Sequence, residues 1–418
     1  MLSFLNPSPS LRSRLVFIFS ASFILLAIMA MQIINKRFWM HDFEVYFMAS
    51  KAFTGGSLVY GLPFGLGSGY YKYSPFALYL FIPLSLLPFT VAKVIFYLLI
   101  SGATIISILF SAKLLNAGSR NPITFSNGTF FILLGIISSQ VFRELHLGNI
   151  NMLLLLLLLT VLQLILLNKH IAAGLLFSVV LFIKPHFLVL LPLLFIRKYY
   201  KCLWATMAGL IIGFLLTAMV SGIKGTIGLH KQWFLTMQMH NQSLLQAPDT
   251  IYSWSYRIFF YSVIPESSTY LKASPLFVII LVAAAFGWFV LANMRSEKKI
   301  IMPEIDNHSF VLEFILLIAI VPNLVLTDSE HFLLSTPVIL FLLGIVKPNR
   351  NSWHFMILTI LAILLYAMNI HDLIGAMFSE WLTKYGILGL GNLMIILLAI
   401  FWFRNHSFVI NHRAGISS

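Results

Sequence analysis

The sequence predicts an all-α, polytopic transmembrane protein, a single domain over residues 1–418 with about 11–13 hydrophobic helices and two large outer-face loops. Hydrophobic residues make up 60% of the chain, charged residues only 10%, and the mean hydropathy is +0.94, which excludes a soluble globular protein. Basic residues between the apolar runs account for the net charge of +14, so the charge indicates cytoplasmic links and no nucleic-acid partner. The single cysteine, Cys202, excludes an intramolecular disulfide and a cysteine-based metal cluster.

The first span is expected over residues 15–34, directly after Arg12 and Arg14. This run is longer than the apolar core of a signal peptide and lacks a small-residue cleavage site, so we interpret it as an uncleaved helix. With the two arginines in the cytoplasm, residues 36–74 form the first outer loop. A helix inside this loop is expected to end at the turn Gly55-Gly56.

The remaining spans follow from the same alternation of apolar runs and basic links. Apolar elements are expected at residues 90–112, 125–141, 151–167, 203–220, 274–293, 310–326, 332–345, 355–368 and 387–403. A proline-broken segment, residues 75–88, precedes the first of them, and residues 221–273 form the second outer loop. Every basic link then faces the cytoplasm, together with both termini, as expected for a protein of the inner or plasma membrane.

A helical hairpin of half the membrane depth is expected between Lys169 and Arg197. The interval is too short for two spans, yet it must begin and end on one side of the membrane. Its bend contains Lys184 and Pro185. A lysine at such depth is costly and usually has an anionic partner or a wet cavity, whereas the alternative is that it snorkels to the surface.

Most acidic residues fall outside in this topology, so any chemistry is expected on the outer face. Asp42 stands where the first span leaves the bilayer, and a carboxylate there can take a proton from a hydroxyl acceptor or orient it. The alternative is an ordinary solvated loop acid. Asp42 and Glu44 are two residues apart, so they face different ways on a helix and do not form a pair that shares a proton.

Two further polar clusters are candidates for substrate binding. The second outer loop holds Asn241 and Gln242 among aromatic residues, a composition that suits sugar binding but also membrane anchoring, and Arg257 of this loop can meet a phosphate. Residues 327–331 interrupt two apolar helices and include His331. An ordinary polar turn would look similar.

Taken together, these residues resemble glycosyltransferase family 87, integral membrane enzymes of the GT-C superfamily that include polyprenol-phosphate-mannose-dependent mannosyltransferases. The resemblance covers about residues 15–345. It is carried by Asp42 to Tyr46, Gly55 to Tyr60, Tyr71 to Pro75, Pro83 to Pro88, Gly148 to Asn151, Lys184-Pro185 and Asn241 to Leu244. The chain departs from the family pattern in two places, with Asn149 where glutamine is usual and with Asp328 to His331 in place of a Trp-x-His-His element.

The resemblance implies transfer of a mannose-like hexose to a lipid or glycan acceptor, with membrane lipids as surroundings. Nucleotide sugars are cytoplasmic, so an outward active site needs a membrane-borne donor such as a polyprenyl-phosphate sugar. Asp42 is the expected catalytic base, and Lys184, with Arg143 or Arg257 as helpers, the expected partner of the donor phosphate. The expected substrate-binding residues are Tyr46, Tyr73, Asn151, Asn241, Gln242 and His331. Because the chain has no Asp-x-Asp motif, neither a metal nor another cofactor is expected.

Two other classes of protein remain open. A lipid or solute transporter would use charges inside the membrane as a relay, but here the charges gather at one face and few lie at depth. A membrane acyltransferase of the outer face would centre on a loop histidine, for which His146 and His331 are candidates.

Overall fold

A computed structural model of the chain describes residues 11–65, 69–117, 122–243, 284, 287–291, 303–325, 328–346, 353–370 and 374–414. These residues form helices and no strand, and one isolated bridge pairs Pro63 with Tyr70. Within the described chain, five helices are long and apolar enough to cross a membrane, or six if the broken pair at residues 127–147 is one span. The predicted all-α, polytopic membrane fold is confirmed.

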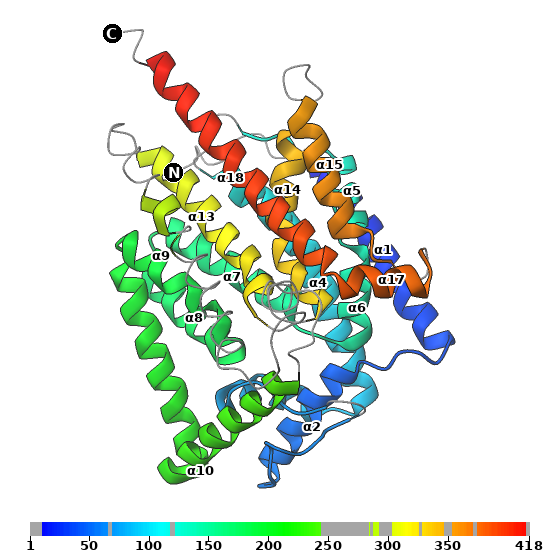
Figure 1. The fold of residues 1–418 in the computed structure, drawn as a ribbon. Helices are drawn as coiled ribbons and strands as arrows, with labels where there is room; N and C mark the ends of the chain where they lie inside the picture. Colours follow the sequence, from blue (N-terminus) through cyan, green and yellow to red (C-terminus); the bar gives the residue numbers. More distant parts are fainter. Residues whose placement is uncertain are drawn as a thin grey trace, which may run out of the picture. The chain divides into compact units, whose positions relative to one another are not determined.

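The chain divides into two compact units, and each is described by itself. The first, here called the N-terminal unit, comprises Arg14–Phe110 and Gln140–Gln246, and the remainder forms the C-terminal unit. Helices of the N-terminal unit are α1 (Leu11–Ile34), α2 (His41–Thr54), η1 (Pro75–Ala77), α3 (Leu78–Ser85), α4 (Phe89–Leu115), α6 (Ser138–Leu147), α7 (Asn151–Leu166), α8 (His170–Ile183), η2 (Pro185–Val189), α9 (Leu190–Ile196) and α10 (Tyr200–Ser243), with α1, α4 and α6 reaching slightly beyond it (Figure 1).

Several predicted elements of the N-terminal unit are confirmed. The first span and the span over residues 90–112 appear as α1 and α4, and the proline-broken segment appears as η1 followed by α3. The interval between Lys169 and Arg197 is a helix–turn–helix of α8, η2 and α9, with Lys184 in extended backbone at the bend.

Two predicted elements differ from the structure. The span expected over residues 125–141 is two short helices, because the helix breaks at Ile137 and α6 continues through the segment predicted as a link. α6 buries Gln140 and Glu144 together with apolar neighbours, a polar packing face that hydropathy alone does not distinguish from a loop. In addition, residues 221–243 of the second outer loop are helical, since α10 resumes after a kink at Gly222, where φ is 70° (Figure 1). Residues 244–273 of that loop lie outside the described residues.

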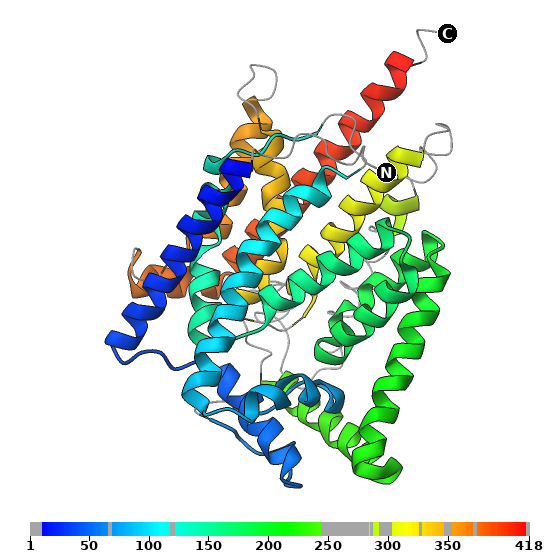
Figure 2. The same ribbon diagram turned by 180° about the vertical axis from the view of Figure 1, so that it is seen from behind.

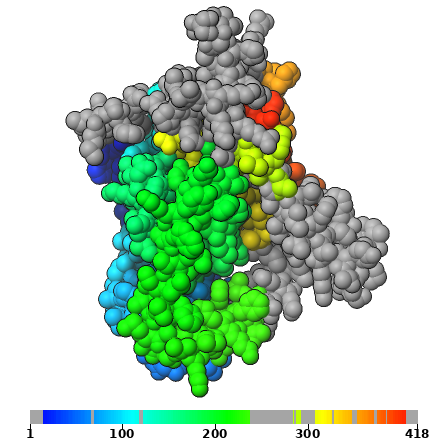
Figure 3. Space-filling model, turned by 90° about the vertical axis from the view of Figure 1, so that its left-hand side faces the viewer, coloured from blue at the N-terminus to red at the C-terminus, as the bar shows by residue number. Residues whose placement is uncertain are grey.

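Glycines let α8 and α10 pack closely. A Cβ on Gly174 would collide with the backbone of Cys202, and one on Gly209 would collide with the side chain of Ser178. Small residues at such crossings are typical of helix pairs in membranes, where close backbone approach replaces hydrophobic driving force. Figure 2 shows α7, α8 and α10 as neighbours, and Figure 3 looks onto the outer side of α10. α10 exposes large apolar side chains such as Trp204 and Met219. This packing supports the bend that carries Lys184.

The C-terminal unit is a further set of helices. It contains α5 (Asn127–Ile136), α13 (Pro303–Leu324), η3 (Ser329–Ser335), α14 (Thr336–Ile345), α15 (Trp353–Ala367), α17 (Ala376–Lys384) and α18 (Ile387–Ala414). The apolar elements expected over residues 310–326, 332–345, 355–368 and 387–403 therefore appear as helices, whereas the element expected over residues 274–293 lies largely outside the described residues. Buried amides join α13 to α18, since Asn392 Nδ2 donates to Asn323 Oδ1 at 2.6 Å and to Ala319 O at 2.9 Å.

Candidate active site

α2 carries Asp42 and is anchored on both sides of it. Its first residue follows Met40, which has a left-handed backbone with φ 55° and donates its N–H to the carbonyl of His146 at 3.0 Å. The Phe43 ring stacks on Phe96 of α4, with 4.3 Å between centroids. This apolar face of α2 is buried, while Asp42 on another face of the helix remains partly exposed.

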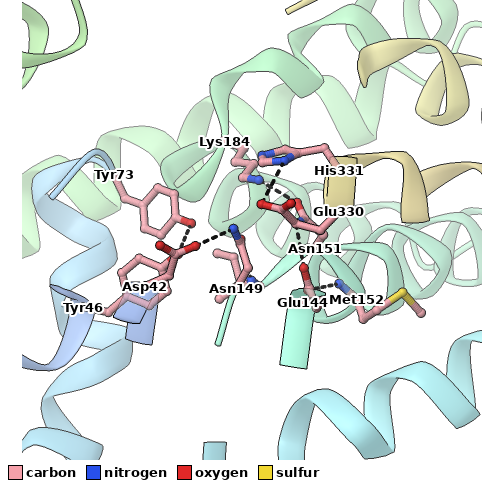
Figure 4. Close-up of polar contacts among 11 residues, drawn as sticks. Asp42, Tyr46, Tyr73, Glu144, Asn149, Asn151, Met152, Lys184, Glu330 and His331 are labelled. Atoms are coloured by element: carbon pink, nitrogen blue, oxygen red, sulfur yellow. Dashed lines mark hydrogen bonds and ion pairs between the residues drawn. The ribbon is translucent and has the colours of Figure 1, made fainter. Parts of the chain in front are cut away.

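Asp42 is held by the turn between α6 and α7. Asn149 Nδ2 donates to Asp42 Oδ2 at 2.8 Å, and Asn149 Oδ1 accepts the backbone N–H of Ile150 at 2.8 Å (Figure 4). Since a backbone N–H can only donate, the amide oxygen must face Ile150 and the amide nitrogen must face the carboxylate. The turn therefore fixes one oxygen of Asp42 in place.

Gly148 lets this turn approach α2. Its φ is +69°, and a Cβ at this position would lie 2.8 Å from Phe43 Cβ and 2.9 Å from Met40 Cε. Both the left-handed backbone and the lack of space therefore favour glycine here. The Gly148 N–H also donates to the Glu144 carbonyl at 2.9 Å, which ends α6.

Replacing Gly148 by alanine is expected to lower the activity of the protein on the order of 10²-fold, because the added methyl group would push α2 and Asp42 away from Asn149. Gly56→Ala is the matched control. Gly56 has a similar φ of +72°, but a Cβ added there would meet no atom within 4 Å, so alanine introduces the same backbone strain without a collision. Turnover of the two purified variants should differ clearly, and equal losses would show that backbone strain alone is responsible.

Tyr46 and Tyr73 meet close to Asp42. Their hydroxyl oxygens lie 2.8 Å apart, and Tyr60 donates its hydroxyl to the Tyr73 carbonyl at 2.8 Å. Burial raises the pKa of the Tyr46 phenol well above its ordinary value, and the neighbouring Tyr73 and Asp42 raise this pKa further. Tyr46 therefore stays neutral and can act as a hydrogen-bond donor beside the carboxylate.

Lys184 belongs to a buried polar chain. Its ammonium donates to Asn151 Oδ1 at 2.6 Å, and Asn151 Nδ2 donates to Glu144 Oε2 at 2.8 Å (Figure 4). The other carboxylate oxygen, Oε1, accepts the backbone N–H of Met152 at 2.9 Å. Lys184 is only 7% exposed, and both Asn151 and Glu144 are fully buried. The ammonium thus makes an inward contact with a neutral amide that is itself bonded to a carboxylate.

The bend with Lys184 is also tied to the segment with Tyr73. The Ser74 N–H donates to the carbonyl of Phe182 at 3.2 Å, two residues before Lys184. On the other side, Trp233 Nε1 in the second arm of α10 donates to the Lys72 carbonyl at 2.9 Å. These two hydrogen bonds therefore hold residues 72–74, at the end of the first loop, between α8 and α10.

Glu144 was not predicted from the sequence as part of this site. The residue falls between the apolar elements expected over residues 125–141 and 151–167, in a link that the predicted topology places outside, whereas the structure buries it fully in α6. The only signal was the spacing of Gln140 and Glu144, which lie one helical turn apart on the buried face. Its partner Asn151 follows on the next helix, and hydropathy does not show that the two meet.

The other predicted site residues are placed as follows. Arg143 lies on α6 with an exposed side chain, one residue before the buried Glu144. Asn241 and Gln242 lie at the end of α10, where only the backbone is described, and Arg257 lies outside the described residues. His331 belongs to η3 of the C-terminal unit, with its Nδ1 3.9 Å from Glu330 Oε1. Within the described chain, no group of three or more histidine, cysteine, aspartate or glutamate side chains could hold a metal ion.

One turn thus holds a carboxylate and an ammonium group, through amides two residues apart in sequence. Asn149 contacts Asp42, and Asn151 contacts Lys184. A partly exposed carboxylate can accept a proton, and a buried cation can stabilise negative charge that develops on a leaving group.

Comparison with known proteins identifies the family of the chain. The sequence model of glycosyltransferase family 87 matches residues 71–301, more than half of the chain. The match covers Tyr73, the turn at Gly148, and Lys184, while Asp42 and His331 lie outside it. No curated protein and no solved structure matches the chain. With its apolar helices and this family match, the chain belongs to glycosyltransferase family 87 and is a multi-pass membrane glycosyltransferase.

Proposed function

We propose that the protein moves a mannose-like hexose from a polyprenyl-phosphate sugar to a lipid or glycan acceptor on the outer face of the cell membrane. The observation that carries this proposal is the pairing of Asp42 and Lys184 on one turn, through Asn149 and Asn151. The outward orientation rests on the basic links, which place both termini in the cytoplasm.

In the proposed reaction, the acceptor hydroxyl attacks the anomeric carbon and gives its proton to Asp42. The bond between that carbon and the phosphate oxygen breaks, and its electron pair leaves with the polyprenyl phosphate. Lys184 stabilises the charge that this phosphate gains, a role that a cation performs best where water is scarce. Inversion at the anomeric carbon is what the superfamily implies.

The remaining residues are proposed to bind substrate. Tyr46 and Tyr73 offer neutral phenols to sugar hydroxyls, with Tyr46 held protonated by its burial. Arg143 and Arg257 assist at the donor phosphate. Further contacts to the sugar or the acceptor come from Asn241, Gln242 and His331. Asn151, which was expected to bind substrate, instead acts through Lys184, because its amide is fully buried and is bonded to Lys184 and Glu144. The proposed reaction needs no cofactor beyond the donor lipid.

Donor choice tests this proposal directly. Purified protein in proteoliposomes of known orientation is expected to transfer radiolabelled sugar from external polyprenyl-phosphate mannose, with chelator present throughout. The same vesicles with Asp42→Asn protein give the background. A reaction driven equally well by nucleotide sugar would contradict the proposed donor and orientation, and a reaction that stops in chelator would contradict the role of Lys184. Movement of the labelled lipid across the membrane without sugar transfer would favour the alternative that the protein is a lipid transporter. Transfer of an acyl group would favour the alternative of a membrane acyltransferase.

A further inference from the structure

Glu144 is a buried carboxylate for which the proposed reaction has no direct use. It is fully buried in α6, and donors occupy both of its oxygens, Asn151 Nδ2 at Oε2 and the Met152 N–H at Oε1. A carboxylate removed from water is costly unless hydrogen bonds and an opposite charge compensate it. Here the opposite charge is Lys184, close enough to attract Glu144 across the side chain of Asn151.

Asn151 connects the two charges in only one orientation. The lysine ammonium can only donate, and both oxygens of Glu144 accept, Oε2 from Asn151 and Oε1 from the Met152 N–H. The amide must therefore turn its oxygen to Lys184 and its nitrogen to Glu144, as the distances of 2.6 Å and 2.8 Å show (Figure 4). Removing the Glu144 carboxylate would take away the acceptor that keeps the amide oxygen on the lysine side.

We propose that Glu144 is a positioning residue, which holds Lys184 through Asn151 at the place where the leaving phosphate forms. This inference rests on the proposed function of Lys184. Glu144 orients the ammonium group of Lys184, and Lys184 itself contacts the phosphate.

Glu144→Gln is expected to disturb this chain although it changes the side-chain volume very little. Glutamine offers one oxygen and one NH₂ group where glutamate offers two acceptors. If its oxygen stays on the Met152 N–H, its NH₂ faces Asn151 Nδ2, and if its oxygen faces Asn151, its NH₂ faces the Met152 N–H. In either case two donors oppose each other, so the position of Asn151 and Lys184 must shift.

The first experiment measures kcat and KM of Glu144→Gln with polyprenyl-phosphate mannose as donor. We expect kcat to fall roughly 10- to 100-fold, the loss typical of a displaced catalytic group. The KM for the acceptor should stay within about twofold, because the acceptor does not contact Lys184. In a Lys184→Met background, Glu144→Gln should cause no further loss, because the group through which it acts is already absent.

A full kcat in the single variant would overturn the inference, and so would additive losses in the double variant. Neither result would contradict the proposed function of Lys184 itself. That function is upheld if Lys184→Met alone is inactive. Failure of Lys184→Met to affect transfer would instead contradict the proposed function itself.

A second experiment needs no enzyme assay. Lys184→Met takes the balancing cation away from Glu144, which must then stay charged without a partner or take up a proton. Either costs free energy in the folded state, so the thermal midpoint should fall by a few degrees. Adding Glu144→Gln removes this carboxyl group and should raise the thermal midpoint again. The double variant should therefore fold even if Lys184→Met alone does not. Glu313→Gln, at another fully buried glutamate, is the matched control and should not restore it. A further fall of the midpoint in the Glu144→Gln double variant would overturn the pairing.

Discussion

Asp42→Asn is expected to reduce sugar transfer on the order of 10³-fold or more, while the helix content and the thermal midpoint stay close to those of the wild type. The substitution removes the basic group and leaves the volume almost unchanged. Because asparagine can still offer its amide oxygen to Asn149 Nδ2, the contact that now measures 2.8 Å can persist, and α2 stays anchored. Radiolabelled transfer by purified protein measures the loss.

Glu44→Gln is the matched control for this variant. Glu44 lies two residues further along α2, and its carboxylate lies 3.9 Å from His41 Nδ1. Its loss should change transfer little, since surface pairs of this kind contribute little. Asp42→Glu should lose roughly 10²-fold, because the added methylene moves the carboxylate by about an ångström. Near-normal turnover in Asp42→Asn, or an equal loss in Glu44→Gln, would contradict the assignment of Asp42 as the base.

Most of the transmembrane fold could be predicted from the sequence because long apolar runs have few alternatives in a bilayer. α1 and α4 coincide with such runs, and the prolines at 83 and 88 correctly indicated a broken segment. α6 and the second arm of α10 could not be predicted in this way. Both are helices of mixed polarity, and hydropathy does not distinguish such helices from loops.

The candidate site shows a similar limit. The resemblance to the family indicated Tyr73, Asn151 and Lys184, which the structure places within the N-terminal unit together with Asp42. Their roles remain predictions. What the sequence could not show is how these residues meet, because Asp42 and Asn149 lie 107 positions apart and Asn151 and Lys184 lie 33 apart. Contacts of this range depend on tertiary packing, here on the close approach of Gly148 to α2.

Lys184→Met is the second substitution with a large expected effect. Methionine matches the length of the lysine side chain and suits apolar surroundings, but it carries no charge and no donor. We expect transfer to fall roughly 10²- to 10³-fold, as when one donor is removed from a site that stabilises developing negative charge. Single-turnover measurements with a polyprenyl-phosphate sugar separate this loss from an effect on product release.

Two further variants define what Lys184 contributes. Lys184→Arg retains the charge, but its planar guanidinium cannot reproduce the contact that Lys184 Nζ makes with Asn151 Oδ1 at 2.6 Å, so we expect only partial activity. Lys224→Met, at an exposed lysine of α10, controls for loss of positive charge in general and should leave transfer unchanged. If Lys184→Met were as active as Lys224→Met, the buried lysine would serve only the structure of the bend between α8 and α9. A leaving phosphate would then need another cation, for which Arg143 on α6 is the described candidate.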